Sequence, residues 1–182
     1  MSKFDLRPAV PNYKCSNGSG RDAERIFREE CERRGIFYGK VGEENDIGID
    51  VITYCIDEQG KKIYKNVQIT IASKQTHPKT YLVNKKIKDI RSDIDIVAIY
   101  VPYKSTQPEQ ANINTGKVGD HGFWFLIPIE VYTHPDMYKN YCNTVEVWAF
   151  NAEKRFKPPI DRCLNQWCFL TREDMPAPEY FF

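Results

Sequence analysis

The chain has 182 residues, of which 41% are hydrophobic, 13% aromatic and 28% charged, and its formal net charge is +1. This length and apolar content suit one folded domain and exclude bulk disorder. No apolar run approaches the roughly 20 residues that a membrane helix needs. The first residues, MSKFDLRPAV, lack the apolar core of a secretory signal, so we expect a cytoplasmic protein without a membrane partner.

The near-neutral total hides one strongly basic segment. Residues 1–60 carry a net charge of −3 and residues 92–182 a net charge of −4. Residues 61–91 hold nine basic residues and a single acid, Asp89, so their net charge is +8. Such a segment is either a solvated surface or a face that binds phosphate groups.

The six cysteines do not form a metal-binding pattern. No close pair of cysteines or histidines completes a zinc site, and without a secretory signal we expect reduced thiols. They are interpreted as small buried hydrophobic residues. The six are Cys15, Cys31, Cys55, Cys142, Cys163 and Cys168.

Residues 20–35, GRDAERIFREECERRG, predict a helix after an irregular lead-in over residues 1–19. Its apolar residues recur at steps of three and four, which is typical of a helix with one buried stripe. Acids lie in the first turn and arginines in the last, an order that suits the helix dipole. Gly35 is well placed to end the helix.

The pattern then changes to that of strands. Residues 36–41 suit a short strand, and residues 48–56 and 62–72 are rich in β-branched and aromatic residues. The turn signal DEQG at 57–60 predicts a hairpin between the two longer strands. Residues 79–93, KTYLVNKKIKDIRSD, are interpreted as holding a short basic helix.

The second half of the chain predicts further strands. Residues 94–101 are almost continuously apolar, as expected for a strand covered on both faces. Residues 103–121 suit a long loop, GFWFLIPI a strand ending at Pro128, and residues 144–150 another strand. The tail is expected to wrap the surface around one short helix near 160–168. The whole chain predicts a mixed α/β (α+β) fold with its leading helix packed on a central sheet.

Common catalytic motifs are missing from the sequence. It holds no Gly-rich phosphate loop, no HExxH, no nucleophile elbow and no CxxC. The three histidines, His77, His121 and His134, are scattered and are interpreted as surface or loop residues.

Two polar residues in apolar strands point to a site. Asp50 lies in ENDIGIDVI, where an unpaired buried charge is costly, and period two places it on one face with Ile52 and Tyr54. Gln68 lies in the partner strand among apolar residues. If the register allows it, Asp50 and Gln68 converge. The alternative is structural, with Asp50 capping a turn and Gln68 satisfying backbone groups at a sheet edge.

The order of these motifs resembles that of the PD-(D/E)xK nuclease superfamily. The similar features are a helix carrying Glu24, then GIDVITY, a hairpin turn and NVQIT. SDIDIVAIYVP and GFWFLIPIEVY are similar to later strands of a branch that includes small intron-type endonucleases and related bacterial proteins. The resemblance covers about residues 20–132 and implies a restriction-endonuclease-like fold, with residues 133–182 as a divergent C-terminal extension of a single domain.

The resemblance also implies roles for individual residues. Asp50 matches the metal-binding aspartate, Gln68 the residue that supports metal or water, and Glu24 a helix carboxylate aimed at the metal. Glu30 is a rival for the helix position because it lies nearer the buried stripe, and Asp46 is a candidate accessory ligand. The implied cofactor is Mg²⁺, with Mn²⁺ as a substitute, because its ligands are hard oxygens.

The sequence departs from the family at one position. Thr70 stands where the family has a lysine that orients the attacking water, and a hydroxyl cannot replace an ammonium in that electrostatic role. Lys74 is on the same face of the strand but about 13 Å further along, so it is catalytic only if the strand bends or bulges. Lys65 is a weaker candidate because it precedes the motif on the opposite face.

The protein is therefore expected to be a Mg²⁺-dependent endonuclease that acts on DNA. A homodimer is a candidate assembly, because two copies could cut both strands. The alternative is a catalytically degenerate nuclease fold that serves in nucleic-acid binding or protein assembly. A third interpretation is an accidental motif, with Asp50 and Gln68 on opposite faces. The aromatic tail residues Trp148, Trp167, Tyr180, Phe181 and Phe182 supply either an interface or part of the core. The basic residues expected to contact phosphates are Lys74, Lys79, Lys85, Lys86, Lys88 and Arg91.

Overall fold

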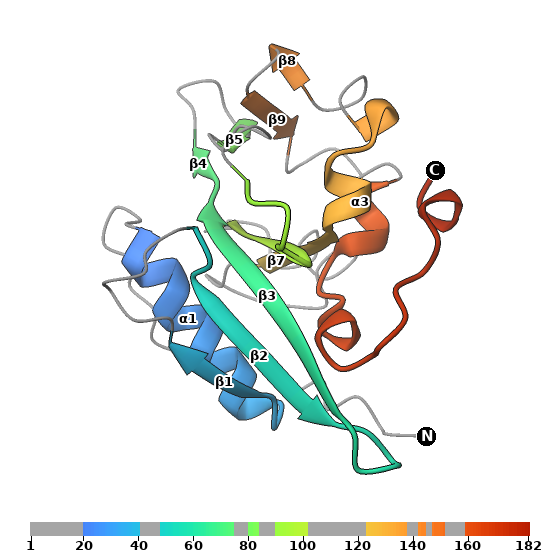
Figure 1. Ribbon diagram of the computed structural model, residues 1–182. Coiled ribbons are helices and arrows are strands. Elements are labelled where there is room, and N and C mark those ends of the chain that lie inside the picture. Colours follow the sequence, from blue (N-terminus) through green and yellow to red (C-terminus); the bar gives the residue numbers. More distant parts are fainter. Residues whose placement is uncertain are drawn as a thin grey trace, which may run out of the picture.

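A five-stranded mixed sheet with a leading helix forms the centre of the protein (Figure 1). The computed structural model describes residues 20–40, 48–74, 80–83, 90–101, 123–137, 142–144, 147–151 and 159–182. The strand order is β1-β2-β3-β6-β7, in which β6 runs parallel to β3 and the other neighbours are antiparallel. The predicted α+β class is confirmed. The strands are β1 (Phe37–Lys40), β2 (Val51–Ile56), β3 (Lys62–Ile71), β6 (Ile96–Val101) and β7 (Phe123–Pro128).

The leading helix α1 (Gly20–Arg33) lies where the sequence predicts it. Its apolar stripe is buried, with Ala23, Phe27 and Cys31 fully inaccessible to solvent. The Phe27 ring contacts the rings of Trp124 and Trp167, with centroids 5.3 and 5.4 Å away. These contacts fasten the helix to one face of the sheet.

The central strands carry the expected burial patterns. Every residue of β6 and of β7 is buried, as the continuous apolar runs predicted. The β2–β3 hairpin pairs Val51 with Val67 at one end and Ile56 with Lys62 at the other. Gly60, with φ of +81°, closes the predicted turn.

A second, four-stranded sheet limits one prediction. Residues 80–83, the start of the segment interpreted as holding a short basic helix, form strand β5. Thr80, Tyr81 and Val83 are β-branched or aromatic, and the whole strand pairs with β9, so distant pairing decided the conformation. Residues 84–89 lie outside the described residues. The sheet order is β4-β5-β9-β8, formed by β4 (Ser73–Lys74), β5 (Thr80–Val83), β9 (Val147–Asn151) and β8 (Cys142–Thr144).

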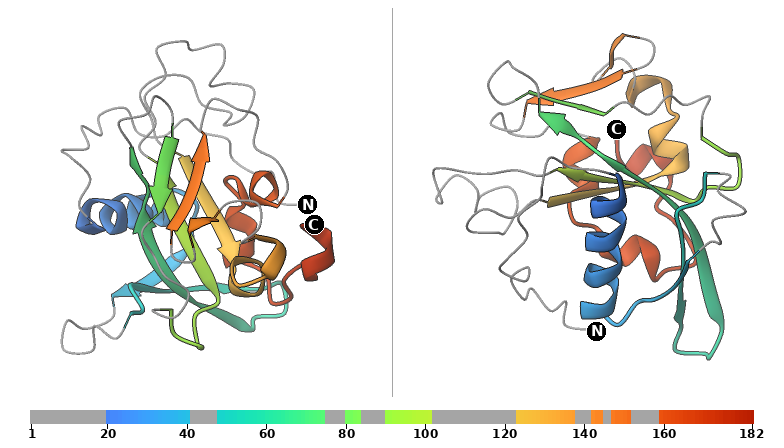
Figure 2. Two further views of the ribbon diagram at one scale, coloured as in Figure 1. Left: turned by 90° about the horizontal axis from the view of Figure 1, so that it is seen from above. Right: turned by 90° about the vertical axis from the view of Figure 1, so that its left-hand side faces the viewer.

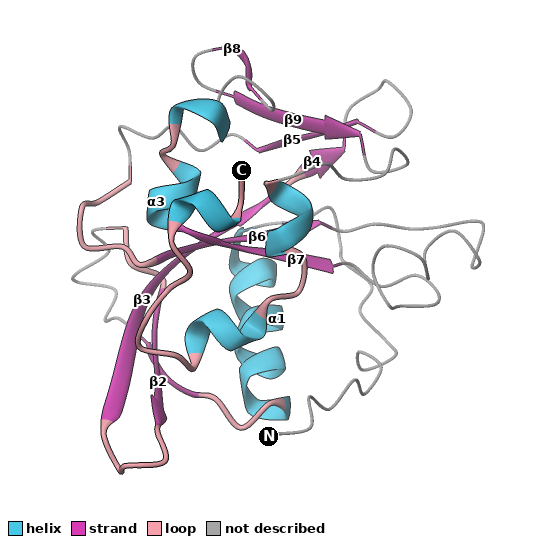
Figure 3. Cartoon of the chain, turned by 90° about the vertical axis from the view of Figure 1, so that its right-hand side faces the viewer, coloured by secondary structure: helices cyan, strands magenta, loops and turns pink. Residues whose placement is uncertain are grey.

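The C-terminal segment, residues 159–182, contributes side chains to the core, whereas the sequence predicted that it wraps the surface. Two 3-10 turns replace the single helix expected near 160–168, separated by Asn165 with a positive φ of 52°. Trp167 is 4% exposed and Phe181 fully buried, whereas Tyr180 is 57% exposed; the side chain of Trp148 lies outside the description. Figure 3 shows these turns beside α3. The short elements are α3 (Ile129–Tyr132), η3 (Ile160–Cys163), η4 (Trp167–Leu170) and η5 (Pro178–Tyr180).

None of the described helices is long and apolar enough to cross a membrane. The described cysteines Cys31, Cys55, Cys163 and Cys168 are free thiols. Burial raises the pKa of the Cys31 and Cys163 thiols well above their ordinary value. These two residues therefore behave as the small buried hydrophobic residues that the sequence predicted.

Candidate active site

Asp50 and Gln68 meet at the point where β2 begins. The Gln68 Nε2 atom donates a hydrogen bond to Asp50 Oδ2 at 2.5 Å. The predicted convergence of the two side chains is therefore observed. The interpretation that placed them on opposite faces of the sheet is wrong.

Asp50 directly precedes β2 and stays bonded to β3. Val51 pairs with Val67, and the Asp50 N–H donates to the Val67 carbonyl at 3.0 Å. Ile52 and Tyr54 pair with Asn66 and Tyr64, which alternate onto the same face of β3 as Gln68. The bond from Gln68 to Asp50 therefore agrees with the period-two placement of Asp50 with Ile52 and Tyr54.

The Asp50 carboxylate also completes the hydrogen bonding of the sheet. Its Oδ2 atom accepts the Ile69 N–H at 2.5 Å. Strand pairing between β2 and β3 ends at Val67, so the carboxylate stands in for a strand carbonyl that β2 no longer supplies. Asp50 thus has a structural role besides its contact with Gln68, but at a strand and not as the predicted turn cap, and the printed bond of Gln68 goes to the Asp50 side chain and not to a backbone group.

The Gln68 amide oxygen is buried and has no hydrogen-bond partner among the described residues. Because a carboxylate only accepts hydrogen bonds, the amide nitrogen must face Asp50 and the oxygen must point away from it. A Cβ added at Gly48 would lie 3.4 Å from this oxygen, and Gly48 has a φ of +93° that L side chains rarely adopt. An orphaned buried acceptor is costly, and beside a carboxylate it fits a hard cation.

Arg91 reaches the same place from the segment before β6. Its Cδ atom lies 3.7 Å from the same Cβ position at Gly48, so Arg91 Cδ and Gln68 Oε1 are at most about 7 Å apart. Its Nε and Nη2 atoms donate to the two carboxylate oxygens of Asp93 at 2.8 and 2.7 Å. This pairing raises the pKa of the Arg91 guanidinium and lowers the pKa of the Asp93 carboxyl. The aliphatic part of Arg91 is thus placed near Gln68, while its guanidinium is paired with Asp93.

Two hydrogen bonds from Asn66 hold the Arg91 segment against β3. The Asn66 Nδ2 atom donates to the Asp93 carbonyl at 2.8 Å, and its backbone N–H donates to Asp95 Oδ2 at 2.7 Å. Sequence reasoning assigned Arg91 to phosphate binding but did not place it beside Gln68. Asp93 and Gly48 were missed as parts of the site, and the only signal was the glycine of the G-I-D motif.

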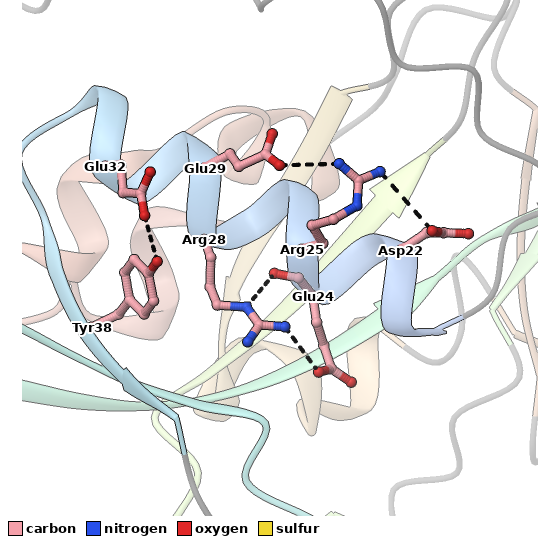
Figure 4. Close-up of polar contacts among 7 residues, drawn as sticks. All are labelled: Asp22, Glu24, Arg25, Arg28, Glu29, Glu32 and Tyr38. Carbon is pink, nitrogen blue, oxygen red and sulfur yellow. Dashed lines mark hydrogen bonds and ion pairs between the residues drawn. The ribbon is translucent and has the colours of Figure 1, made fainter.

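The helix carboxylates are engaged within α1. Glu24 Oε2 lies 3.6 Å from Arg28 Nη2, and both side chains are partly exposed on one side of the helix (Figure 4). Glu30 is 6% exposed and forms ion pairs with Arg33 and Arg34. Over the described part of the chain, no group of three His, Cys, Asp or Glu side chains is arranged to hold a metal ion. The implied role of Glu24 as a metal ligand stays a prediction.

Of the candidate lysines, Lys65 lies away from the Asp50–Gln68 site, and the side chains of the others are outside the described residues. Lys65 is buried, and its Nζ atom donates to the Glu173 carbonyl at 3.1 Å on the face of β3 opposite Gln68. Lys74 lies in β4, which Ala72 separates from β3, but its side chain lies outside the description, so its catalytic role stays a prediction. Thr70 is partly buried on the face that carries Gln68. Asp46, Lys79, Lys85, Lys86 and Lys88 lie outside the described residues.

No family model matches the sequence, and no curated protein matches it. Among solved structures, the chain is similar to I-Ssp6803I, a bacterial homing endonuclease, with 15% sequence identity and a TM-score of 0.49. The match covers 81% of this chain and 85% of that chain.

Proposed function

We propose that this protein is a Mg²⁺-dependent endonuclease that hydrolyses phosphodiester bonds in DNA, with Asp50 and Gln68 holding the cation and Mn²⁺ as a substitute. The observation that carries the proposal is the buried Gln68 amide oxygen, which has no hydrogen-bond partner in the part of the chain that the structure describes and belongs to the side chain that bonds Asp50. Mg²⁺ prefers oxygen ligands of this kind. The resemblance of GIDVITY and NVQIT to motifs of the PD-(D/E)xK nucleases supports the same assignment.

Each residue of the site has a defined task in this proposal. When bound, the cation polarises the phosphate and lowers the pKa of a bound water. Asp50 is held by the Ile69 N–H and the Gln68 amide, so its carboxylate is oriented in advance. The Arg91 guanidinium supplies the positive charge that Thr70 cannot provide and neutralises the phosphate. Glu24 can become a further ligand of the cation only if its carboxylate breaks its ion pair with Arg28.

Cation binding is tested by thermal unfolding with and without Mn²⁺ at neutral pH, because a cation that binds only the folded protein raises Tm. We expect a rise in Tm for the wild type that Gln68→Leu loses, since leucine has no oxygen to offer. Asp57→Ala is the matched control. The Asp57 carboxylate also accepts two backbone N–H groups, each at 2.8 Å, but at the far end of the β2–β3 hairpin. An equal rise in Tm for Gln68→Leu would contradict the proposed site.

Hydrolysis is tested by nicking of supercoiled plasmid in the presence of Mg²⁺ or Mn²⁺. We expect nicking by the wild type and none by Asp50→Asn, which removes the charge and keeps the shape. Asp57→Ala should nick as the wild type does. Nicking that persists in Asp50→Asn, or that needs no divalent cation, would contradict the proposal.

A second candidate function is a catalytically degenerate module that binds nucleic acid or assembles with proteins. The bond from Ile69 N–H to Asp50 favours it, because this bond gives the carboxylate a structural reason to be present. Thr70 favours it too. This candidate predicts DNA binding that needs no cation and survives Asp50→Asn. It gains most if Thr70→Lys cleaves DNA where the wild type does not.

A further inference from the structure

Three aromatic side chains form one row across the outer strands of the main sheet. Phe37 of β1 pairs with Tyr54 of β2, and Tyr54 pairs with Tyr64 of β3. The Phe37 and Tyr54 rings are stacked with centroids 5.0 Å apart, and the Tyr54 and Tyr64 centroids are 5.8 Å apart. Phe37 is 53% and Tyr64 56% exposed. Exposed aromatic groups gathered in this way mark an interaction site.

The row faces away from α1. Phe27 of the helix contacts Trp124, which pairs with Tyr100, which in turn pairs with Ile71 of β3. The helix therefore covers the face of β3 that carries Ile71, and Tyr64 lies on the other face because side chains alternate along a strand. In the right-hand view of Figure 2, α1 lies on one side of the β2–β3 hairpin and the other side points outward.

The row shares its face of β3 with the candidate active site. Tyr64, Asn66 and Gln68 alternate onto this face, and four residues of strand separate Tyr64 from Gln68 by about 13 Å. Asn66 bonds the Asp93 carbonyl, and the Asp93 carboxylate holds Arg91. The Arg91–Asp93 pair thus lies part-way between the row and Gln68.

The surroundings of the row suit a polyanion. The Lys62 Nζ atom lies 5.8 Å from the centre of the Tyr54 ring. The other residues on this face of the three strands near the row are Gly39, Ile52, Ile56 and Asn66, which include no carboxylate. Two carboxylates lie beyond Asn66, where Asp95 accepts the Asn66 N–H and Asp93 is paired with Arg91. A Cβ added at Gly39 would meet no atom within 4 Å, so the surface beside the row is open at β1.

We propose that this row binds unpaired bases of a single-stranded stretch of DNA, which stack on Phe37 and Tyr64 while neighbouring phosphates contact Lys62 and Arg91. Exposed rings combined with cations are the means by which proteins hold single strands without reading their sequence. The inference rests on the proposed function and names its substrate class. The site acts on DNA that has an unpaired stretch about 13 Å from the bond to be cleaved.

The test measures binding separately from hydrolysis. Fluorescence anisotropy in EDTA follows a labelled oligothymidine of about 12 nucleotides, a length typical of single-strand binding sites. We expect Phe37→Ala and Tyr64→Ala each to raise Kd about tenfold, and Tyr64→Phe to bind as the wild type does, because it keeps the ring. Both side chains are more than half exposed, so the variants should keep the wild-type circular dichroism spectrum.

Tyr180→Ala is the matched control, because Tyr180 is 57% exposed but lies in the C-terminal segment. Its Kd should equal that of the wild type. Wild-type binding by Phe37→Ala and Tyr64→Ala would overturn the inference, as would equally tight, ring-dependent binding of a fully paired duplex. A wild-type dimer in sedimentation that Phe37→Ala dissociates would also overturn it, since a second copy then covers the row. Row-dependent binding without plasmid nicking would support this inference while contradicting the proposed nuclease activity.

Discussion

The Asp50 carboxylate accepts the Ile69 N–H at 2.5 Å, in the position where a neighbouring strand would otherwise supply a carbonyl. The same oxygen accepts the Gln68 amide. One side chain therefore closes the sheet where β2 leaves it and also orients the candidate cation ligand. The contribution of Asp50 to stability and its proposed role in cation binding can be separated by substitutions that keep the hydrogen-bond acceptor and remove the charge.

Asp50→Ala should lower the free energy of unfolding by about 2–4 kcal/mol, because two donors, the Ile69 N–H and the Gln68 amide, lose their acceptor. Asp50→Asn should lose less, since one oxygen accepts both hydrogen bonds and the asparagine oxygen can still accept both, although without the negative charge that strengthens them. Urea unfolding measures both values. Equal stability of the two variants would show that the acceptor is unimportant.

Gly48→Ala should destabilise the protein by about 1–2 kcal/mol because an L residue must then adopt the positive φ. The added methyl group would also contact Gln68 and Arg91. Gly60 has a similar φ of +81°, and a Cβ added there would meet no atom within 4 Å. Gly60→Ala therefore carries only the backbone cost. We therefore expect both variants to lose stability and only Gly48→Ala to weaken the Mn²⁺-dependent rise in Tm.

The Arg91–Asp93 pair predicts a stability difference confined to acid pH. Pairing lowers the pKa of Asp93, so its contribution is complete above the ordinary aspartate value of about 3.9 and is lost as pH falls through the lower folded value. The stability difference between wild type and Asp93→Asn should therefore be constant from neutral pH down to about pH 5, and shrink below about pH 4. Chemical unfolding at a series of pH values measures it. A difference that disappears near neutral pH would contradict the pairing.

Phe27→Ala should cost about 3–5 kcal/mol of stability, because the fully buried ring contacts both Trp124 and Trp167. Phe37→Ala removes the same side chain from an exposed position and should cost less than about 1 kcal/mol. Guanidinium unfolding followed by tryptophan fluorescence compares the two. A small loss for Phe27→Ala would mean that the C-terminal segment does not depend on the helix.

Local patterns predicted the elements whose conformation is decided locally. The stripe of Ala23, Phe27 and Cys31 specifies α1, and the DEQG turn specifies the hairpin, because both depend on residues a few positions apart. The strand at residues 80–83 was not predicted, because β5 pairs with β9, more than sixty residues later in the chain. No local pattern contains that information.

The same division applies to the site. Asp50 and Gln68 stood out as polar residues in apolar strands, and their contact follows from hairpin pairing. The hydrogen bond from the Ile69 N–H to the Asp50 carboxylate and the approach of Arg91 to Gly48 did not. The first depends on where the pairing of β2 with β3 ends, and the second on how the segment before β6 lies against β3, so neither follows from the spacing of residue types.

The Ile69 amide hydrogen is protected by a side chain rather than by a strand. We expect its exchange with solvent deuterium to require breaking the bond to the Asp50 carboxylate, whereas amides of the buried strand β6 require the sheet to open. A ligand that draws on this carboxylate changes the exchange rate of that one proton. The exchange rate of the Ile69 amide, measured by NMR, should therefore show whether a ligand is bound at Asp50, without any substrate or turnover.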